Sequence, residues 1–367
     1  MKLKNIVIFF PNFSKGGIEK ISLLLSNYFV SKGVKIKFIC FDKINYKKFN
    51  FSENIRFYYS KKKNNNFLIR NIFCVFFLYN ILKKHNKKDT VVFSLQNNIL
   101  SIIISKYLGF KIIIRNSAPI DYQKNENSIL NNFKLFLKLK IYLLSDLIIS
   151  NSKSGARKIK DKLKKKHKIL SIPNPLLKIE KIKHKIKKKN TILYVGRLSR
   201  EKGIFELVEG FEMFQKKYPE FNLEIVGDGN QKKKLISMIK KKKLTSKINL
   251  INWSNKLDQY YKHSKILILP SFFEGFGNVL LEALNYRLPC VATRNDGPKE
   301  ILNFGKYGLL MKNNKPETIY KSLSKMIENY NLYKLKSNAG NKNNQKYHIN
   351  IIGSQYFSLL KNILKNK

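Results

Sequence analysis

Short apolar runs, each one strand long, alternate with longer helical segments along most of this chain. The runs are apolar on both faces, which is typical of strands buried in a parallel sheet, and the helical segments are long enough to serve as crossovers. In the first half, a helix is predicted at 18–31, and the predicted strands are 5–10, 34–41, 90–94, 111–115 and 147–150. This alternation predicts a parallel, doubly wound sheet.

The same pattern begins again after a break. Ile172-Pro173-Asn174-Pro175 interrupts it, and residues 178–189 are dense in lysine and poor in apolar residues, which indicates a linker. The strands predicted after it are 191–195, 222–226, 247–252, 266–269 and 290–293. We therefore predict an α/β protein of two Rossmann-like domains that face a cleft, 1–178 and 179–367. The last helix, predicted at 351–366, can return to the first domain.

The 367 residues carry a formal net charge of +50, from 73 basic and 23 acidic side chains. Such an excess fits nucleic-acid binding or attraction to an anionic membrane surface. It also fits codon bias, because Lys, Asn, Ile, Phe and Tyr are abundant throughout. The lysines form no recognisable nucleic-acid module, so we expect no specific nucleic-acid partner. A membrane contribution on top of the bias stays open.

The cysteines and the apolar stretches bear on the compartment. Cys40, Cys74 and Cys290 are scattered, without a Cys-x-x-Cys or a companion histidine, which argues against disulfides and zinc and favours a reducing compartment. No signal peptide is recognised, since the first apolar run ends at Pro11. The longest apolar stretch, 72–82, is too short to span a bilayer and is predicted to be a buried helix.

Two glutamates eight positions apart are the strongest functional signal. Glu274 follows the strand 266–269, and Glu282 lies in the first turns of a helix predicted at 279–284, with Asn278 as its N-cap. Ligands of open α/β sheets bind at the carboxyl ends of the strands. The glycines between the glutamates, Gly275 and Gly277, let the backbone approach such a ligand.

The chemistry of this segment favours a nucleotide-sugar. Two carboxylates accept hydrogen bonds from hydroxyl groups, and the amide groups at the start of the helix favour a phosphate. Taken alone, Glu282 is an ordinary favourable charge near a helix N-terminus and Glu274 an ordinary loop carboxylate. Their combination with the glycines and the strand favours the functional interpretation.

Three further loops follow predicted strands. In Gly196-Arg197-Leu198-Ser199-Arg200-Glu201-Lys202-Gly203, Arg197 and Lys202 suit a diphosphate, although the alternative is a solvated basic turn. Gly16-Gly17 is either a phosphate-approach loop or a flexible turn. Gly227-Asp228-Gly229 lacks the third glycine of a dinucleotide fingerprint and is predicted to be a tight turn that lines the pocket.

The stretch 128–143 mixes apolar residues with lysines, among them Phe133, Phe136, Lys134, Lys138 and Lys140. It is either a basic helix at a membrane interface or a core helix with lysines on its solvated face. The sequence favours neither.

These motifs together resemble glycosyltransferase family 4, whose members have the two-domain GT-B fold. The resemblance covers 192–310 and rests on the motifs at 196–203, 226–229 and 270–277, on Glu282, and on Asp296-Gly297-Pro298-Lys299-Glu300-Ile301. The first half resembles the family only in architecture and in Gly16-Gly17. The resemblance implies transfer of a sugar from a nucleotide-sugar with retention of configuration, without a metal or other cofactor.

It also implies roles for individual residues. Arg197 and Lys202 would hold the diphosphate and, with Glu274, act in catalysis; Glu282 would bind the ribose. The donor site by resemblance comprises Gly16, Gly17, Arg197, Lys202, Gly275, Phe276, Gly277, Asn278 and Glu282. Many members carry a histidine after a strand in the middle of the first half. This chain has none at 114–119, and Arg115 and Asn116 are candidate donor-sugar contacts instead.

The resulting expectation is a retaining hexosyltransferase of bacterial surface-glycan or lipopolysaccharide assembly. Its donor would be a UDP- or GDP-sugar, and its acceptor a growing or polyprenol-diphosphate-linked saccharide. We expect it in the cytoplasm, peripherally at the inner face of the cytoplasmic membrane. The alternatives are a sucrose- or trehalose-type synthase on the same fold and a non-catalytic nucleotide-sugar-binding protein.

Overall fold

The chain divides into two compact units in the computed structural model. Unit 1 comprises 1–177 and 347–367, and unit 2 comprises 178–346. The second predicted range contained the last helix, which lies in unit 1. The structure describes residues 2–12, 17–42, 54–60, 66–117, 129–163, 168–176, 179, 188–254 and 256–365, without the side chains of 67 and 129–132.

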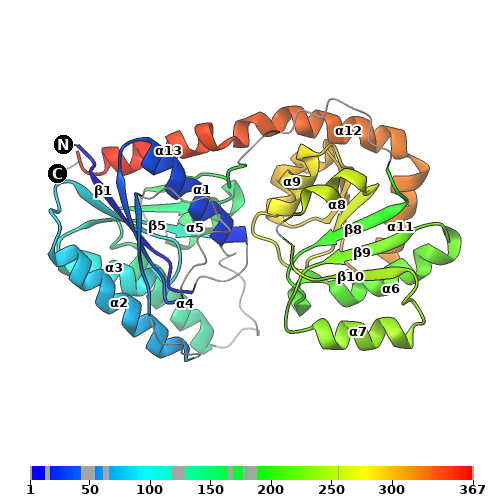
Figure 1. The fold of residues 1–367 in the computed structure, drawn as a ribbon, viewed down its shortest axis with the longest axis horizontal. Coiled ribbons are helices and arrows are strands. Elements are labelled where there is room, and N and C mark those ends of the chain that lie inside the picture. The colour runs from blue at the N-terminus through cyan, green and yellow to red at the C-terminus, as the bar shows by residue number, and fades with distance from the viewer. Residues whose placement is uncertain are drawn as a thin grey trace. The chain divides into compact units, whose positions relative to one another are not determined.

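Unit 1, the part of Figure 1 that contains β1 and β5, is built on a parallel sheet of seven strands in the order β3-β2-β1-β4-β5-β6-β7. The central strands consist of β-branched and aromatic residues that are buried on both faces, such as Thr90–Ser94. The strands are β1 (Asn5–Phe9), β2 (Lys35–Ile39), β3 (Ile55–Tyr58), β4 (Thr90–Ser94), β5 (Lys111–Asn116), β6 (Leu147–Ser150) and β7 (Ile169–Ser171).

Helices cover both faces of this sheet. Alternate residues of β1 point to opposite faces: Ile6 and Ile8 join a core with the first and last helices, and Val7 and Phe9 join a core with the helices between. The helices are α1 (Gly17–Ser31), α2 (Phe67–Lys83), α3 (Asn98–Tyr107), α4 (Ile129–Tyr142), α5 (Lys153–Leu163) and α13 (Ile349–Asn362). The core of unit 1 is therefore completed by α13, which is far from the rest of this unit in the sequence.

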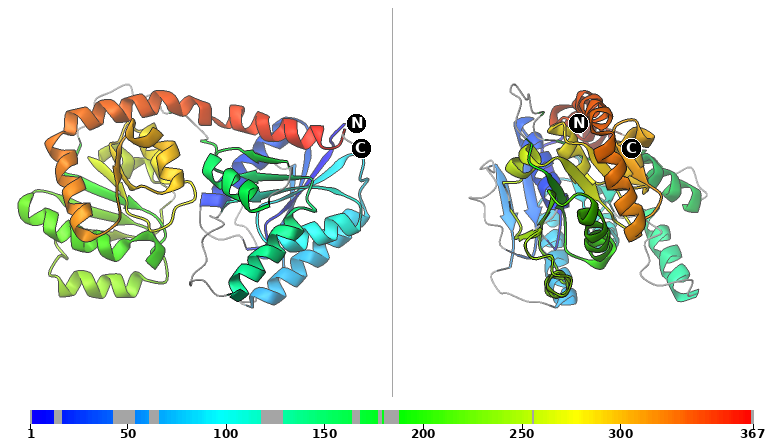
Figure 2. Two further views of the ribbon diagram at one scale, coloured as in Figure 1. Left: turned by 180° about the vertical axis from the view of Figure 1, so that it is seen from behind. Right: turned by 90° about the vertical axis from the view of Figure 1, so that its right-hand side faces the viewer.

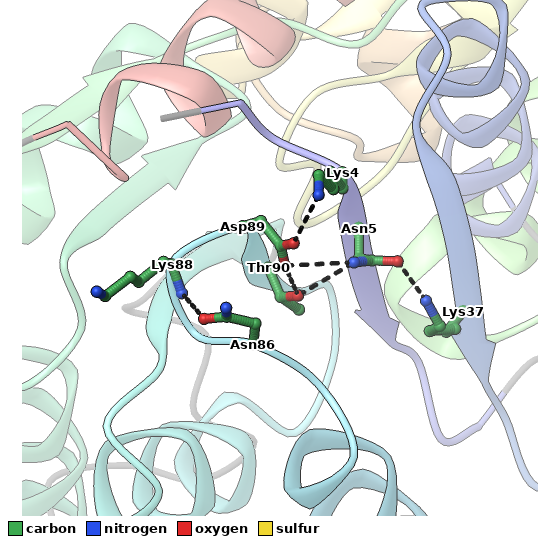
Figure 3. A network of polar contacts seen from close by, with 7 residues as sticks. All are labelled: Lys4, Asn5, Lys37, Asn86, Lys88, Asp89 and Thr90. Carbon is green, nitrogen blue, oxygen red and sulfur yellow. Dashed lines mark hydrogen bonds and ion pairs between the residues drawn. The ribbon is translucent and has the colours of Figure 1, made fainter.

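A polar network joins β2 to the amino ends of β1 and β4 in unit 1 (Figure 3). Lys37 of β2 donates to Asn5 Oδ1 at 2.5 Å, and the amide of Asn5 donates to Asp89 and Thr90 at 3.4 and 3.3 Å. Burial lowers the pKa of Lys37, as does the charge of Lys35, while Asp89 raises it. The network fixes β1 between β2 and β4.

Unit 2 contains a second parallel sheet, in the order β10-β9-β8-β11-β12-β13. Its strands are β8 (Thr191–Val195), β9 (Asn222–Val226), β10 (Ile248–Ile251), β11 (Ile266–Leu269), β12 (Cys290–Thr293) and β13 (Leu309–Met311). Its helices are α6 (Ile204–Lys217), α7 (Lys232–Lys241), α8 (Asp258–His263), α9 (Asn278–Asn285), α10 (Asp296–Ile301), α11 (Pro316–Glu328) and α12 (Tyr330–Asn343). Short 3-10 turns are η2 (Arg200–Lys202), η3 (Asn303–Gly305) and η4 (Asn344–Tyr347).

Each sheet has a switch point, where the strand order reverses. In unit 1 it lies between β1 and β4, and in unit 2 between β8 and β11. The loops that leave the carboxyl ends of two such strands diverge and leave a crevice, which is the usual ligand site of doubly wound sheets.

The predicted fold class, α/β with two Rossmann-like parts, is confirmed, and all ten predicted strands are present. Two predictions are wrong. The helix after Glu274 is capped by Gly277 at φ 95°, and Asn278 is its first residue. The apolar run 72–82 belongs to α2 but is not a buried helix, because Ile72 and Phe76 are 60% and 61% exposed.

Much of the predicted linker 178–189 lies outside the described residues. Its end does not: Lys188 Nζ donates to the carbonyl of Tyr261, and the amide of Lys189 donates to the carbonyl of His263. Of the helices that the structure describes, none has the length and apolar character needed to cross a bilayer.

Candidate active site

The first wall of the crevice in unit 2 is the connection from β8 to α6. It contains Arg197, whose side chain is exposed, and the short turn η2, whose C-cap is Gly203 with φ 67°. The hydroxyl of the buried Tyr194 donates to the carbonyl of Arg197 at 3.0 Å. Burial raises the pKa of Tyr194, and the charges of Glu274 and Glu201 raise it further, so this hydroxyl remains a donor.

Glycines lock this loop against the loop after β9. A Cβ atom on Gly227 would lie 1.9 Å from the carbonyl oxygen of Gly196, and one on Gly229 would lie 2.3 Å from that of Leu198. The amide of Leu198 donates to the carbonyl of Asp228 at 2.9 Å. The glycines at 227 and 229 are therefore needed for the close approach of two backbones, and the predicted tight turn that lines the pocket stays a prediction.

The second wall is the connection from β11 to α9, which contains Glu274. Lys202 Nζ from the first wall lies 2.7 Å from Glu274 Oε2, and the two side chains are 22% and 15% exposed. The structure thus brings together Glu274 and Lys202, one of the two cations that the resemblance assigned to catalysis with this glutamate. They meet at the switch point, because β8 and β11 are neighbours in the sheet.

The two walls also meet through their backbones. The amide of Phe272 donates to the carbonyl of Glu201 at 2.9 Å, and a Cβ on Gly203 would lie 2.1 Å from the carbonyl oxygen of Pro270. Ser199 Oγ donates to Glu201 Oε1 at 2.6 Å. The first two contacts fix the separation of the walls, and the Ser199–Glu201 hydrogen bond orders the first wall.

Burial alone would raise the pKa of Glu201. The hydrogen bond from Ser199, the backbone of Glu201 and the charges of Lys202 and Arg197 oppose burial and leave this pKa below its ordinary value. Glu201 is thus an anion close enough to both predicted phosphate-binding cations for their charges to lower its pKa. The sequence analysis did not single it out.

The segment between the two glutamates is held from a third loop. Phe276 is buried, and a Cβ on Gly297, at the start of α10, would lie 2.3 Å from its Cα. Asn295 Nδ2 donates to the carbonyl of Ser271 at 2.8 Å. These contacts position the backbone from Gly275 to Asn278, where the phosphate site was predicted.

Glu282 lies in the second turn of α9 and is held by a tyrosine. Tyr261 of α8 donates its hydroxyl to Glu282 Oε2 at 2.8 Å, and its ring stacks on Tyr286 with centroids 5.6 Å apart. Burial raises the pKa of Tyr261, with Glu282 adding to the effect, so the phenol remains protonated. The sequence analysis missed Tyr261, because no spacing relates a residue of α8 to one of α9.

The remaining candidates lie in unit 1. Gly17 is the first residue of α1, and Gly16 lies outside the described residues. Asn116 is buried, and Arg115 is 1% exposed. The guanidinium of Arg115 donates to Tyr356 of α13, to Ser117 and to Asn174, so it holds unit 1 together; its predicted sugar contact stays a prediction.

Taken together, unit 2 offers an ion pair, an exposed arginine and a second, oriented carboxylate around the switch point. Arginine and lysine suit a diphosphate, and carboxylates suit sugar hydroxyls. In the described ranges, no three His, Cys, Asp or Glu side chains gather where they could share a metal ion.

The fold defines the class of protein. Two units, each with a doubly wound parallel sheet, form the two-domain α/β fold of GT-B glycosyltransferases. A solved structure with this fold, sucrose-phosphate synthase from Thermosynechococcus elongatus, aligns with a TM-score of 0.83 and 16% identity, over 99% of this chain and 100% of that one. An identity this low shows the fold alone.

Sequence comparisons also point to glycosyltransferases. Residues 178–347 match the family described as "Glycosyl transferases group 1". An uncharacterized glycosyltransferase of Haemophilus influenzae is 28% identical over 98% of this chain and its own full length. The N-acetylgalactosamine-N,N'-diacetylbacillosaminyl-diphospho-undecaprenol 4-alpha-N-acetylgalactosaminyltransferase of Campylobacter jejuni is 28% identical over 60% of this chain and 61% of its own. These similarities support the conclusion that this chain is a glycosyltransferase.

Proposed function

We propose that this protein is a retaining, metal-independent glycosyltransferase of family 4. It moves a hexose or an N-acetylhexosamine from a UDP- or GDP-sugar to a growing or polyprenol-diphosphate-linked saccharide. The reaction serves the assembly of a bacterial surface polysaccharide, lipopolysaccharide or related glycan. The enzyme works in the cytoplasm, peripherally at the inner face of the membrane.

The observation that carries this proposal is the Lys202–Glu274 contact of 2.7 Å at the switch point of unit 2. It lies in the part of the chain that matches the group 1 family. An incoming diphosphate would compete with Glu274 for the Lys202 ammonium and free the carboxylate for the donor sugar. Arg197, which is exposed in the same loop, would hold the second phosphate.

The reaction needs little covalent chemistry from the protein. The cations stabilise the negative charge that develops on the leaving diphosphate, and Glu282 orients the ribose. The acceptor hydroxyl attacks the anomeric carbon from the face that the diphosphate leaves, so no enzyme nucleophile is required and the configuration is retained. Catalysis is then mostly positioning.

Two experiments test this proposal. A thermal-shift screen with uridine, guanosine and adenosine diphosphate sugars identifies the donor, since a ligand at a hundred times its Kd stabilises by about 2.7 kcal/mol. Nucleoside diphosphate release is then followed with lipid-linked saccharides as acceptors, and the anomeric configuration of the product is determined by NMR. Binding of no nucleotide-sugar, or an inverted product, would refute the proposal.

The lipid-linked acceptor has support from one relative, the Campylobacter jejuni transferase, whose name includes a diphospho-undecaprenol carrier. The fold does not choose between this acceptor and a small sugar, because sucrose-phosphate synthase has the same fold. Release of nucleoside diphosphate with fructose 6-phosphate or glucose as the acceptor would favour the synthase alternative. Binding of the donor without release in any acceptor mixture would favour a non-catalytic binding protein.

A further inference from the structure

The α2 helix exposes apolar side chains in a regular stripe. Its inner face is in the core, with Cys74 and Leu78 fully buried. Its outer face presents Ile72 and Phe76, four positions apart and 60% and 61% exposed, and Leu68 continues the stripe. Exposing such side chains to water is unfavourable, so a stripe of this kind indicates a surface that something covers.

The neighbouring helices extend this surface. The α3 helix packs between α2 and α4 on one face of the sheet, as Figure 2 shows from behind. The large apolar side chains that are exposed on these helices, or two residues after α4, are Leu68, Ile69, Ile72, Phe76, Ile103, Tyr107, Phe133, Phe136, Leu137 and Leu144. These are ten of the eighteen large apolar side chains exposed in the described part of the chain. Codon bias would spread them evenly, so their concentration has another cause.

Among charged side chains, the three helices themselves carry only basic ones. No Asp or Glu occurs in α2, α3 or α4. Lys134 and Lys140 of α4 are exposed, whereas Lys138 is partly buried over the ring of Tyr142. On α2, Arg70 is paired with Asp42, and the first lysine is Lys83 in the last turn. Exposed cations thus lie mainly on α4, whereas α2 carries the apolar stripe and one exposed lysine, Lys83, in its last turn.

We propose that the outer surface of α2, α3 and α4 docks on an anionic lipid bilayer, with α2 inserting its apolar stripe and α4 binding the headgroups through Lys134 and Lys140. Helices with basic and no acidic side chains match anionic lipid and would repel a second copy of themselves. Two separate signals give firmer membrane binding than either alone. This docking does not depend on the transfer reaction and can be tested without it.

The test is sedimentation of the full chain with vesicles of phosphatidylglycerol and phosphatidylethanolamine in equal parts, at low and at high salt. The double variant Ile72→Gln/Phe76→Gln removes the stripe, and its control is Leu332→Gln/Leu335→Gln, which changes residues of α12 that are 50% and 67% exposed. We expect the α2 variant to lose binding about tenfold or more at both salt concentrations. The α12 control should bind as wild type does.

The charge component has its own matched pair. Lys134→Gln/Lys140→Gln should weaken binding at low salt and leave the salt-resistant remainder unchanged, because only the electrostatic attraction is screened. The control, Lys240→Gln/Lys241→Gln, removes two exposed lysines from the last turn of α7. It should have the smaller effect at low salt.

Melting temperatures of all four variants show that a loss of binding is not a loss of folding. Wild-type binding by the α2 variant, or equal losses in the α2 and α12 variants, would overturn the proposal. So would a wild-type protein that ignores vesicles but self-associates through this surface. Light scattering would reveal that case as a dimer that the α2 variant cannot form.

Discussion

At the scale of single residues, the oriented carboxylate of Glu282 is the most specific feature of the candidate site. Its partner Tyr261 is buried, keeps its proton and donates at 2.8 Å. This hydrogen bond fixes the orientation of the carboxylate, so a ribose hydroxyl would donate to it from a defined direction. Tyr261 acts through Glu282 and is a positioning residue.

This relation gives a double-mutant prediction. Glu282→Ala should weaken binding of the preferred nucleoside diphosphate by about 1.5–3 kcal/mol, and Tyr261→Phe by less. In the Glu282→Ala background, Tyr261→Phe should have no further effect, because its target is absent. Calorimetric titration measures all four proteins. The control is Tyr218→Phe, which removes a hydroxyl that also donates to a carboxylate, Glu328, away from the site. Additive losses would show that Tyr261 does not act through Glu282.

A second prediction concerns the two cations. Lys202→Ala and Arg197→Ala should each lower kcat about a hundredfold, because each removes stabilisation of the leaving diphosphate. Arg200→Ala is the matched control in the same turn, where Arg200 pairs with Glu206. Steady-state rates of nucleoside diphosphate release give kcat for the three variants and the wild type. Variants of Lys202 and Arg197 that turn over like the Arg200 control would show that both are ordinary surface cations.

At the scale of elements, the glycine contacts between loops hold the site in shape. Gly227→Ala should reduce the stability of unit 2 by about 1–3 kcal/mol and weaken nucleotide binding, because the new Cβ would meet the carbonyl oxygen of Gly196 at 1.9 Å. Chemical denaturation and nucleotide titration measure the two effects. Gly33→Ala is the control: its φ of 79° is unfavourable, but no atom lies within 4 Å of its Cβ. Gly33→Ala should lower the free energy of unfolding by about 1 kcal/mol and leave nucleotide binding unchanged. Normal binding by Gly227→Ala would contradict a role in the site.

The elements also show what the sequence could predict. Strands at sheet centres, such as Ile266–Leu269, are buried on both faces and form continuous apolar runs. The strands that the sequence analysis missed, β3, β7 and β13, are all at sheet edges. Their residues are largely half-buried, so their apolar pattern is weak.

Two other differences have local causes. Run 72–82 is so uniformly apolar that its periodicity does not distinguish the buried face of α2 from the exposed one. Asn278 was the better N-cap by residue type, but Gly277 adopts the left-handed backbone that the turn after Glu274 requires. The pairing of Lys202 with Glu274 was predictable from strand ends. The pairing of Tyr261 with Glu282 depends on how α8 and α9 pack, which no spacing encodes.

At the scale of the whole molecule, the chain is predicted to work without a divalent metal. Cationic side chains would take the role of a metal at the diphosphate. Activity should therefore persist after dialysis against ethylenediaminetetraacetate, and neither magnesium nor manganese should raise it. An activity that the chelator abolishes and manganese restores would contradict this prediction.

The way in which the chain passes between its units has a consequence for biosynthesis. Unit 1 needs residues 347–367, and α13 supplies Ile352, Tyr356 and Leu360 to the core that α1 and β1 begin. During synthesis, all of unit 2 leaves the ribosome before α13 does. The first sheet to be translated is thus the last to be completed, and until then the hydrophobic side of α1 that packs on α13 lacks its cover. During translation, the core of unit 1 therefore stays incomplete until the segment that contains α13 has emerged.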